Sequence, residues 1–128
     1  MNSKRLLHSC VMDETTSTVY VMGGWTERFE RSNSTEKWIF GTDSWQPSTA
    51  LPIDLSGSSA VPSTSNEYIG YMAGGCTSKG DNGKDGITSK IWGLSRDDKT
   101  WVEMNITMKM GRYEHTLLSV PADSVLKC

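Results

Sequence analysis

Residues 19–24 read VYVMGG, a run of strand-forming side chains that ends in two glycines. Residues 68–75, YIGYMAGG, end in a second glycine pair about 51 positions further along the chain. A tryptophan follows each pair, Trp45 in the first case and Trp101 in the second, and these are about 56 positions apart. Repeats of this length are typical of units built from four short strands. The repetition therefore predicts the architecture, and it indicates that most of the conspicuous residues are structural.

The segments around these stretches are short, alternate between polar and apolar residues, and are separated by turns rich in Gly, Ser, Asn and Asp, which is typical of strands. The expected strands cover residues 6–12, 18–22, 36–40 and a fourth opened by Trp45 in the first unit, residues 57–62, 67–73, 90–94 and 101–104 in the second, and residues 113–120 and 125–128 in a third. No stretch shows the 3.6-residue periodicity of a helix. The sequence therefore predicts an all-β fold.

The composition limits the classes of partner. A length of 128 residues suffices for one domain with its own core. The formal net charge of -2 comes without the basic stripe that nucleic-acid-binding domains carry. No apolar run approaches the roughly 18 residues that cross a bilayer. We therefore expect no nucleic acid and no membrane as a partner.

The cysteines and the glycosylation sequons point to different compartments. Cys10, Cys76 and Cys128 are far apart and lack metal-ligand spacing, which favours free thiols in a reducing, cytoplasmic environment. The sequons at Asn33 and Asn105 favour an extracellular one. The localisation is therefore left open between the two.

The repeated pattern resembles the kelch repeat of β-propellers. The matching residues are Arg5 and His8 at the start of a unit, the two glycine pairs, Trp45 followed by Leu51-Pro52, Trp92 and Trp101 in the second unit, and Arg112 with His115 at a third start. The resemblance implies blades of four antiparallel strands and, because a closed propeller needs about four to eight blades, an incomplete propeller. The implied repeats cover about residues 5–52 and 56–108, with a partial third at about 112–128, in one domain over residues 1–128.

The resemblance also implies structural roles for single side chains. Trp45 and Trp101, on the fourth strands, are expected to fill gaps between neighbouring blades. The repeated arginine and histidine positions are expected to hydrogen-bond between strands or blades. These structural roles require no catalytic function of the side chains.

Motifs that indicate catalysis are missing from the sequence. It contains no Gly-x-Ser-x-Gly elbow, no His-x-x-x-His pair and no phosphate-binding loop. Residues 81–86 resemble a calcium loop only in part, since Gly83 stands at the third position and Trp92 at the twelfth. Residues 95–101 resemble the Asp-box of sialidases, with Lys99 where that motif has glycine. We therefore expect no enzyme, no metal and no cofactor.

The candidate binding site is formed by loops. In propellers, the loops that join second to third strands gather at one end, and here these are residues 25–31 and 77–86. Aromatic and arginine side chains in the first loop are typical of interface hot spots. The candidate residues are Trp25, Arg28, Phe29, Arg31, Lys79, Asp81, Lys84 and Asp85. The alternative for Trp25 is that it packs under its own loop.

Two functions are compatible with this pattern. The first is a non-enzymatic protein–protein interaction module built from kelch repeats, as a segment of a larger adaptor or scaffold, with a protein as its partner. The alternative is a fragment of a carbohydrate-active propeller, galactose-oxidase-like or sialidase-like. In either case unpaired strand edges favour self-association through the exposed edges of the blades.

Overall fold

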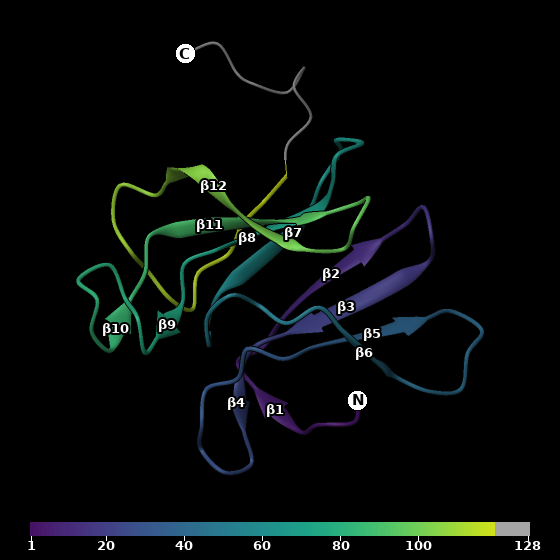
Figure 1. Cartoon of the computed structure of the whole chain (residues 1–128), viewed down its shortest axis with the longest axis horizontal. Helices are drawn as coiled ribbons and strands as arrows, with labels where there is room; N and C mark the ends of the chain where they lie inside the picture. The colour runs from purple at the N-terminus through teal and green to yellow at the C-terminus, as the bar shows by residue number, and fades with distance from the viewer. Residues whose placement is uncertain (120–128) are drawn as a thin grey trace.

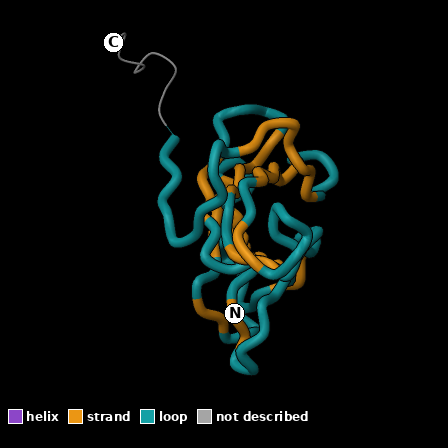
Figure 2. The backbone as a smooth tube through the Cα atoms, turned by 90° about the vertical axis from the view of Figure 1, so that its left-hand side faces the viewer, coloured by secondary structure: helices purple, strands orange, loops and turns teal. Residues whose placement is uncertain are grey.

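The computed structural model describes residues 1–119, and over this range it contains strands, turns and loops but no helix. The strands form two four-stranded antiparallel sheets and two two-stranded sheets. Figure 1 shows the two sheets side by side, and Figure 2 shows the same chain from the side, with loops joining every strand to the next. The prediction of an all-β fold with four-stranded antiparallel sheets is therefore confirmed.

The first sheet is built from four strands that follow one another along the chain. They are β2 (Ser9–Asp13), β3 (Thr18–Met22), β5 (Thr35–Ile39) and β6 (Gln46–Ser48), and the sheet keeps this order. Short turns connect β2 to β3 and β5 to β6, which is the antiparallel meander that short connections favour. The predicted strand over residues 18–22 agrees with β3 in both of its bounds.

The second sheet has the same plan. Its strands are β7 (Ser59–Pro62), β8 (Tyr68–Ala73), β11 (Lys90–Ser95) and β12 (Trp101–Thr107), again in chain order. In both sheets the longest loop separates the second strand from the third. The two units therefore share their strand order and the position of their longest loop.

Each long loop contributes to a two-stranded sheet. β4 (Trp25–Thr26) pairs with β1 (Arg5–Leu6), and β9 (Cys76–Thr77) pairs with β10 (Gly86–Ile87). The prediction of one continuous strand over residues 6–12 is wrong, because Leu7 adopts a left-handed conformation with φ 52°. This residue turns the chain from its pairing with β4 into β2.

The predicted first strand of a third unit is also wrong within the described residues. Residues 113–119 form no strand. Their backbone is held instead by the end of the second sheet, since the Glu114 N–H donates to the Gly57 carbonyl at 2.7 Å. Residue 120 and the strand expected at residues 125–128 lie outside the described residues.

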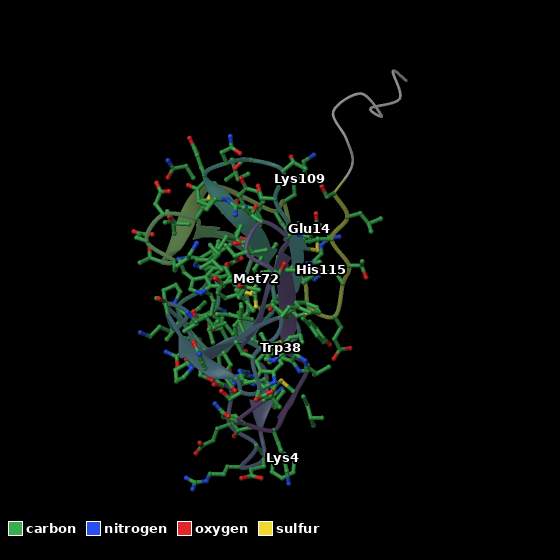
Figure 3. The ribbon with its side chains drawn as sticks, turned by 90° about the vertical axis from the view of Figure 1, so that its right-hand side faces the viewer. Lys4, Glu14, Trp38, Met72, Lys109 and His115 are labelled. Carbon is green, nitrogen blue, oxygen red and sulfur yellow. The ribbon has the colours of Figure 1, made fainter. Side chains whose placement is uncertain are left out.

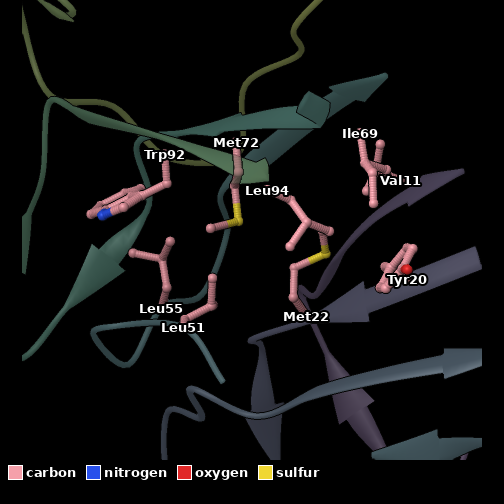
Figure 4. Close-up of a cluster of buried hydrophobic side chains, with 9 residues drawn as sticks. All are labelled: Val11, Tyr20, Met22, Leu51, Leu55, Ile69, Met72, Trp92 and Leu94. Atoms are coloured by element: carbon pink, nitrogen blue, oxygen red, sulfur yellow. The ribbon is translucent and has the colours of Figure 1, made fainter. Parts of the chain in front are cut away.

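The hydrophobic core lies between the two sheets, where β2 contacts β7 and β8 (Figure 4). Its buried members come from both sheets and from the linker between them: Val11, Tyr20, Met22, Leu51, Leu55, Ile69, Met72, Trp92 and Leu94. The sheets approach closely at Gly70, where a Cβ atom would lie 2.5 Å from the Val11 Cγ2. Met72 marks this interior in the side-chain view of Figure 3.

The glycine pairs join each sheet to the segment that starts the next unit. The Gly24 N–H donates to the Leu55 carbonyl at 2.7 Å, and the Gly75 N–H donates to the Arg112 carbonyl at 2.8 Å. The glycine before each of these has a positive φ, +66° at Gly23 and +65° at Gly74. A Cβ atom at either position would lie 2.4 Å from the same carbonyl oxygen. Glycine is therefore required both by the backbone conformation and by the close approach.

Polar contacts complete the connections within and between the sheets. The buried Arg5 guanidinium donates to the Glu36 carboxylate at 2.6 Å and to the Gly23 carbonyl at 2.9 Å, which confirms the hydrogen-bonding role expected of Arg5. The same expectation is wrong for His115, because both of its ring nitrogens are buried without a hydrogen-bond partner among residues 1–119. Between the sheets, Arg96 donates to the Asp13 carboxylate at 2.7 Å. Burial raises the pKa of Asp13, but the hydrogen bonds from Arg96 and Thr16 outweigh this, so its pKa lies below the usual range.

The tryptophan of the core differs from the one expected. Trp92 on β11 is 1 % exposed and belongs to the core cluster, whereas Trp101 only packs partly buried against that cluster. Trp45 is half-buried beside Trp38 of its own sheet, with the ring centroids 6.4 Å apart. Trp45 does not lie between the two sheets, because it is on the side of the first sheet that faces away from the second, so its expected place between neighbouring blades stays a prediction.

Replacing Gly23 with alanine should lower the free energy of unfolding by about 3 kcal/mol, since backbone strain and a clash with the Leu55 carbonyl add together. Gly41→Ala is the matched control, because Gly41 has φ +87° with nothing within 4 Å of a new Cβ. It should cost about 1 kcal/mol through strain alone. Urea denaturation measures both, and equal losses would contradict the close approach at Gly23.

Trp92→Ala should lower the free energy of unfolding by about 3–5 kcal/mol, because it empties a buried site. Trp45→Ala should cost less than about 2 kcal/mol, since the half-buried ring removes less apolar surface from water. Thermal and urea melts of the two variants test this order. A larger loss for Trp45 would show that the core is assigned to the wrong tryptophan.

Candidate functional site

The two predicted loops carry the sheets β1–β4 and β9–β10, which lie at the bottom and at the left of Figure 1. Their contact is an ion pair in which the Arg31 guanidinium donates to the Asp85 carboxylate. These residues are separated by 54 positions in the sequence. The pair therefore joins a loop of the first unit to a loop of the second, as expected for a surface built from both.

Trp25 is held by its own loop. It pairs with Leu6 across the two-stranded sheet β1–β4 and forms an isolated bridge with Arg31. The Arg31 guanidinium carbon stacks over the indole, 4.9 Å from the ring centroid, which is within the range of a cation–π contact. The side chain is half-buried, so the alternative that Trp25 packs under its own loop describes it better than a free hot spot.

Phe29 is the most exposed aromatic side chain of this end. It is 81 % exposed and has φ 57°, a conformation that is rare for a residue with a bulky side chain. The turn that holds it is hydrogen-bonded on both sides: the Phe29 N–H donates to the Thr26 carbonyl at 3.0 Å, and the Thr26 N–H donates to the Glu30 carbonyl at 2.9 Å. The backbone therefore holds the ring in solvent at the tip of the loop.

A shallow hollow lies beside this ring. It has a volume of about 230 Å³, and its walls come from β1, β4 and the turn between Thr26 and Phe29. Leu6 lines it and is 66 % exposed. Lys4 forms part of its rim and lies at the tip of the molecule in Figure 3. An apolar hollow beside an exposed aromatic ring fits an interface anchor.

Residues 4–6 contribute to this end although the sequence does not predict it. The expected strand over residues 6–12 places Leu6 inside the first sheet, whereas the turn at Leu7 carries Leu6 to the loop end. The adjacent pair Leu6-Leu7 was the available signal, because two neighbouring apolar residues break the alternation expected of a strand.

The second loop contributes exposed charges and one structural carboxylate. Lys79 and Lys84 are exposed, as expected. Asp81, by contrast, is used inside the loop: it accepts hydrogen bonds from the Ser89 N–H at 2.9 Å and the Thr88 hydroxyl at 3.0 Å. Asp81 therefore fixes the loop, and its role in binding stays a prediction.

The remaining candidate residue, Arg28, is exposed, and its N–H donates to the Thr26 hydroxyl at 3.3 Å. The structure therefore brings Trp25, Phe29, Arg31 and Asp85 to one end, with Arg28 beside Phe29 in the same turn. Residues 1–119 contain no group of three or more His, Cys, Asp or Glu side chains that could hold a metal ion. The same range contains no helix of sufficient length and apolarity to cross a membrane.

Comparison with known proteins gives no family assignment: no protein family matches the chain, and no curated protein matches it.

Asp81→Asn should lower the free energy of unfolding by about 1.5 kcal/mol, because it weakens charge-assisted hydrogen bonds. Burial raises the pKa of Asp81, but the hydrogen bonds from Ser89 and Thr88 lower it below its ordinary value of 3.8. The stabilisation is therefore complete above the ordinary pKa and is lost as the pH falls through the folded-state pKa. The variant should lack this acid-dependent loss.

Asp85→Asn is the matched control in the same loop. Asp85 is 70 % exposed, and an exposed ion pair contributes about 0–1 kcal/mol. Urea melts between pH 3 and pH 7 compare the two variants. A larger effect for Asp85 than for Asp81 would contradict the structural role of Asp81.

Proposed function

We propose that this chain is a non-enzymatic protein-interaction module built from kelch-type blades, and that it is a segment of a larger adaptor or scaffold. The binding surface is the loop end defined by Phe29, the adjacent hollow and the Arg31–Asp85 pair. The observation that carries the proposal is the exposed ring of Phe29 in a left-handed backbone conformation.

Strain of this kind supports a functional role because it has to be balanced by other contacts. A non-glycine residue with positive φ costs of the order of 1–3 kcal/mol, and such residues gather at binding sites. At Phe29 the strain keeps an aromatic ring away from the core, where it would otherwise be stabilised by burial. An apolar pocket on a partner would recover that burial.

The surroundings of Phe29 match the anatomy of interface hot spots. Aromatic and arginine side chains supply most of the binding energy in such interfaces, with weaker polar contacts around them. Here Trp25 and Arg31 stack next to the hollow, and Arg28, Lys79 and Lys84 supply exposed charge around it. The Arg31–Asp85 pair holds the two loops together, so a partner would meet a surface that needs little ordering.

A library of random 12-residue peptides displayed on phage tests the proposal without a known partner. Peptides enriched on the wild-type chain should bind Phe29→Ala at least about 10-fold more weakly, since loss of a hot spot removes about 2 kcal/mol or more. Leu118→Ala is the control, because Leu118 is 82 % exposed and lies outside the loop end. Binding by titration calorimetry should be unchanged in that variant.

Either of two results would refute the loop end as the binding surface. One is that enriched peptides bind Phe29→Ala as tightly as the wild type. The other is that Leu118→Ala weakens them as much as Phe29→Ala does.

A further inference from the structure

The two sheets pack through unlike faces. We define face A as the side that carries Tyr20 and Met22 in the first sheet. Because Met22 and Ala73 both precede a glycine pair, face A of the second sheet carries Ala73 and, two residues earlier, Tyr71. Face B is the opposite side of each sheet.

Face A of the first sheet packs on face B of the second. Tyr20 and Met22 belong to the core cluster, and they meet Met72 there. A Cβ on Gly70, which shares a side of β8 with Met72, would meet Val11 of the first sheet. The two sheets therefore meet through different faces, so the junction is heterologous.

Among residues 1–119, no sheet covers face A of the second sheet. An apolar groove of about 300 Å³ lies there, lined by Val61, Tyr71, Ile91, Met104 and Ile106. Ile106 is 64 % exposed. Leu117 borders the groove beside β7, where the Leu117 N–H donates to the Ser59 hydroxyl at 2.9 Å, so the open part lies over β8, β11 and β12.

The first sheet leaves its face B open. Met12, Val19 and Trp38 form one cross-strand row on this side, since Met12 pairs with Val19 and Val19 pairs with Trp38. Phe40 is 53 % exposed and stacks on Trp38 with the ring centroids 4.5 Å apart. Together with Trp45 this makes an aromatic surface on the side that points away from the second sheet.

We propose that a second copy of this chain docks face B of its first sheet on face A of the second sheet, repeating the internal junction between molecules. The occupant is inferred from the internal junction itself, in which a face A already binds a face B of this sequence. Both open faces are apolar, and each is the counterpart of a face that is buried within the chain.

The segment that follows the second sheet repeats the backbone hydrogen bonds and φ angles found where the first two units begin. The Gly57 N–H donates to the Leu7 carbonyl at 2.9 Å, and the Glu114 N–H donates to the Gly57 carbonyl at 2.7 Å. All three residues have a positive φ, at 52°, 64° and 51°. The turn that relates the first unit to the second therefore recurs beyond the second sheet, at the border of the groove.

Head-to-tail contacts of this kind close into a ring when the rotation between units permits it. A ring of about four to eight sheets corresponds to about two to four copies, since each copy brings two. Association then proceeds through sheet faces, in place of the strand edges that the sequence suggested.

Sedimentation velocity on the full chain over a 100-fold concentration range tests the proposal. The wild type should gain mass with concentration. Ile106→Glu places a charge in face A, and Phe40→Glu places one on face B, so each variant alone should be monomeric. An equimolar mixture should form a heterodimer and nothing larger, because one intact face A and one intact face B remain.

Phe29→Glu is the control. Because Phe29 lies at the loop end and on neither open face, this variant should assemble like the wild type. The control also separates assembly from the partner binding proposed for the loop end. If circular dichroism shows that either blocking variant is unfolded, Val102→Glu replaces Ile106→Glu and Met12→Glu replaces Phe40→Glu. These sites are 40 % and 39 % exposed. A wild type that stays monomeric would overturn the proposal and would indicate that a different sheet covers the groove. A mixture of the two blocking variants that stays monomeric would also overturn it.

Discussion

Two backbone hydrogen bonds, from Gly24 to the Leu55 carbonyl and from Gly75 to the Arg112 carbonyl, set how each sheet meets the segment that follows it. Each bond forms at the end of the second strand, where the chain must also leave the sheet. The preceding glycine brings the two backbones so close that a methyl group has no room. The spacing between sheets, and with it the volume available to the core, therefore depends on two positions without side chains.

The core follows from that spacing. Leu51 and Leu55 come from the linker and pack under both sheets, so the segment that accepts the Gly24 hydrogen bond also supplies apolar side chains to the cluster. Trp92 and Met72 fill the space on the side of the second sheet. The loop end is comparatively free of such packing, which explains how it can present Phe29 to solvent while the sheets remain well packed.

Much of the fold could be predicted from the sequence because its signals are local. Alternating strands, glycine pairs and polar turns act over a few residues, and β3 was assigned to its exact bounds. The left-handed backbone of Leu7 could not be predicted from the leucine itself, since only the broken alternation at Leu6-Leu7 indicates an interrupted strand. The left-handed backbone of Phe29 could not be predicted from its residue type either. The core position of Trp92 could not be predicted, because both sides of each sheet carry apolar residues and alternation alone does not show which side is covered. Asp81 and Asp85 differ only in the neighbours that the folded loop provides.

The ion pair between Asp13 and Arg96 distinguishes one junction from all others that similar sheets could make. Counting from the strand register, Phe40 occupies the place in the first sheet that Arg96 occupies in the second. If another first sheet took the place of the second sheet at this junction, the buried Asp13 carboxylate would face an aromatic ring and lose its cation. An unpaired buried charge is strongly unfavourable, so this single pair discriminates against the wrong neighbour while adding little to the right one. The Asp13 side chain therefore favours one order in which the sheets follow one another.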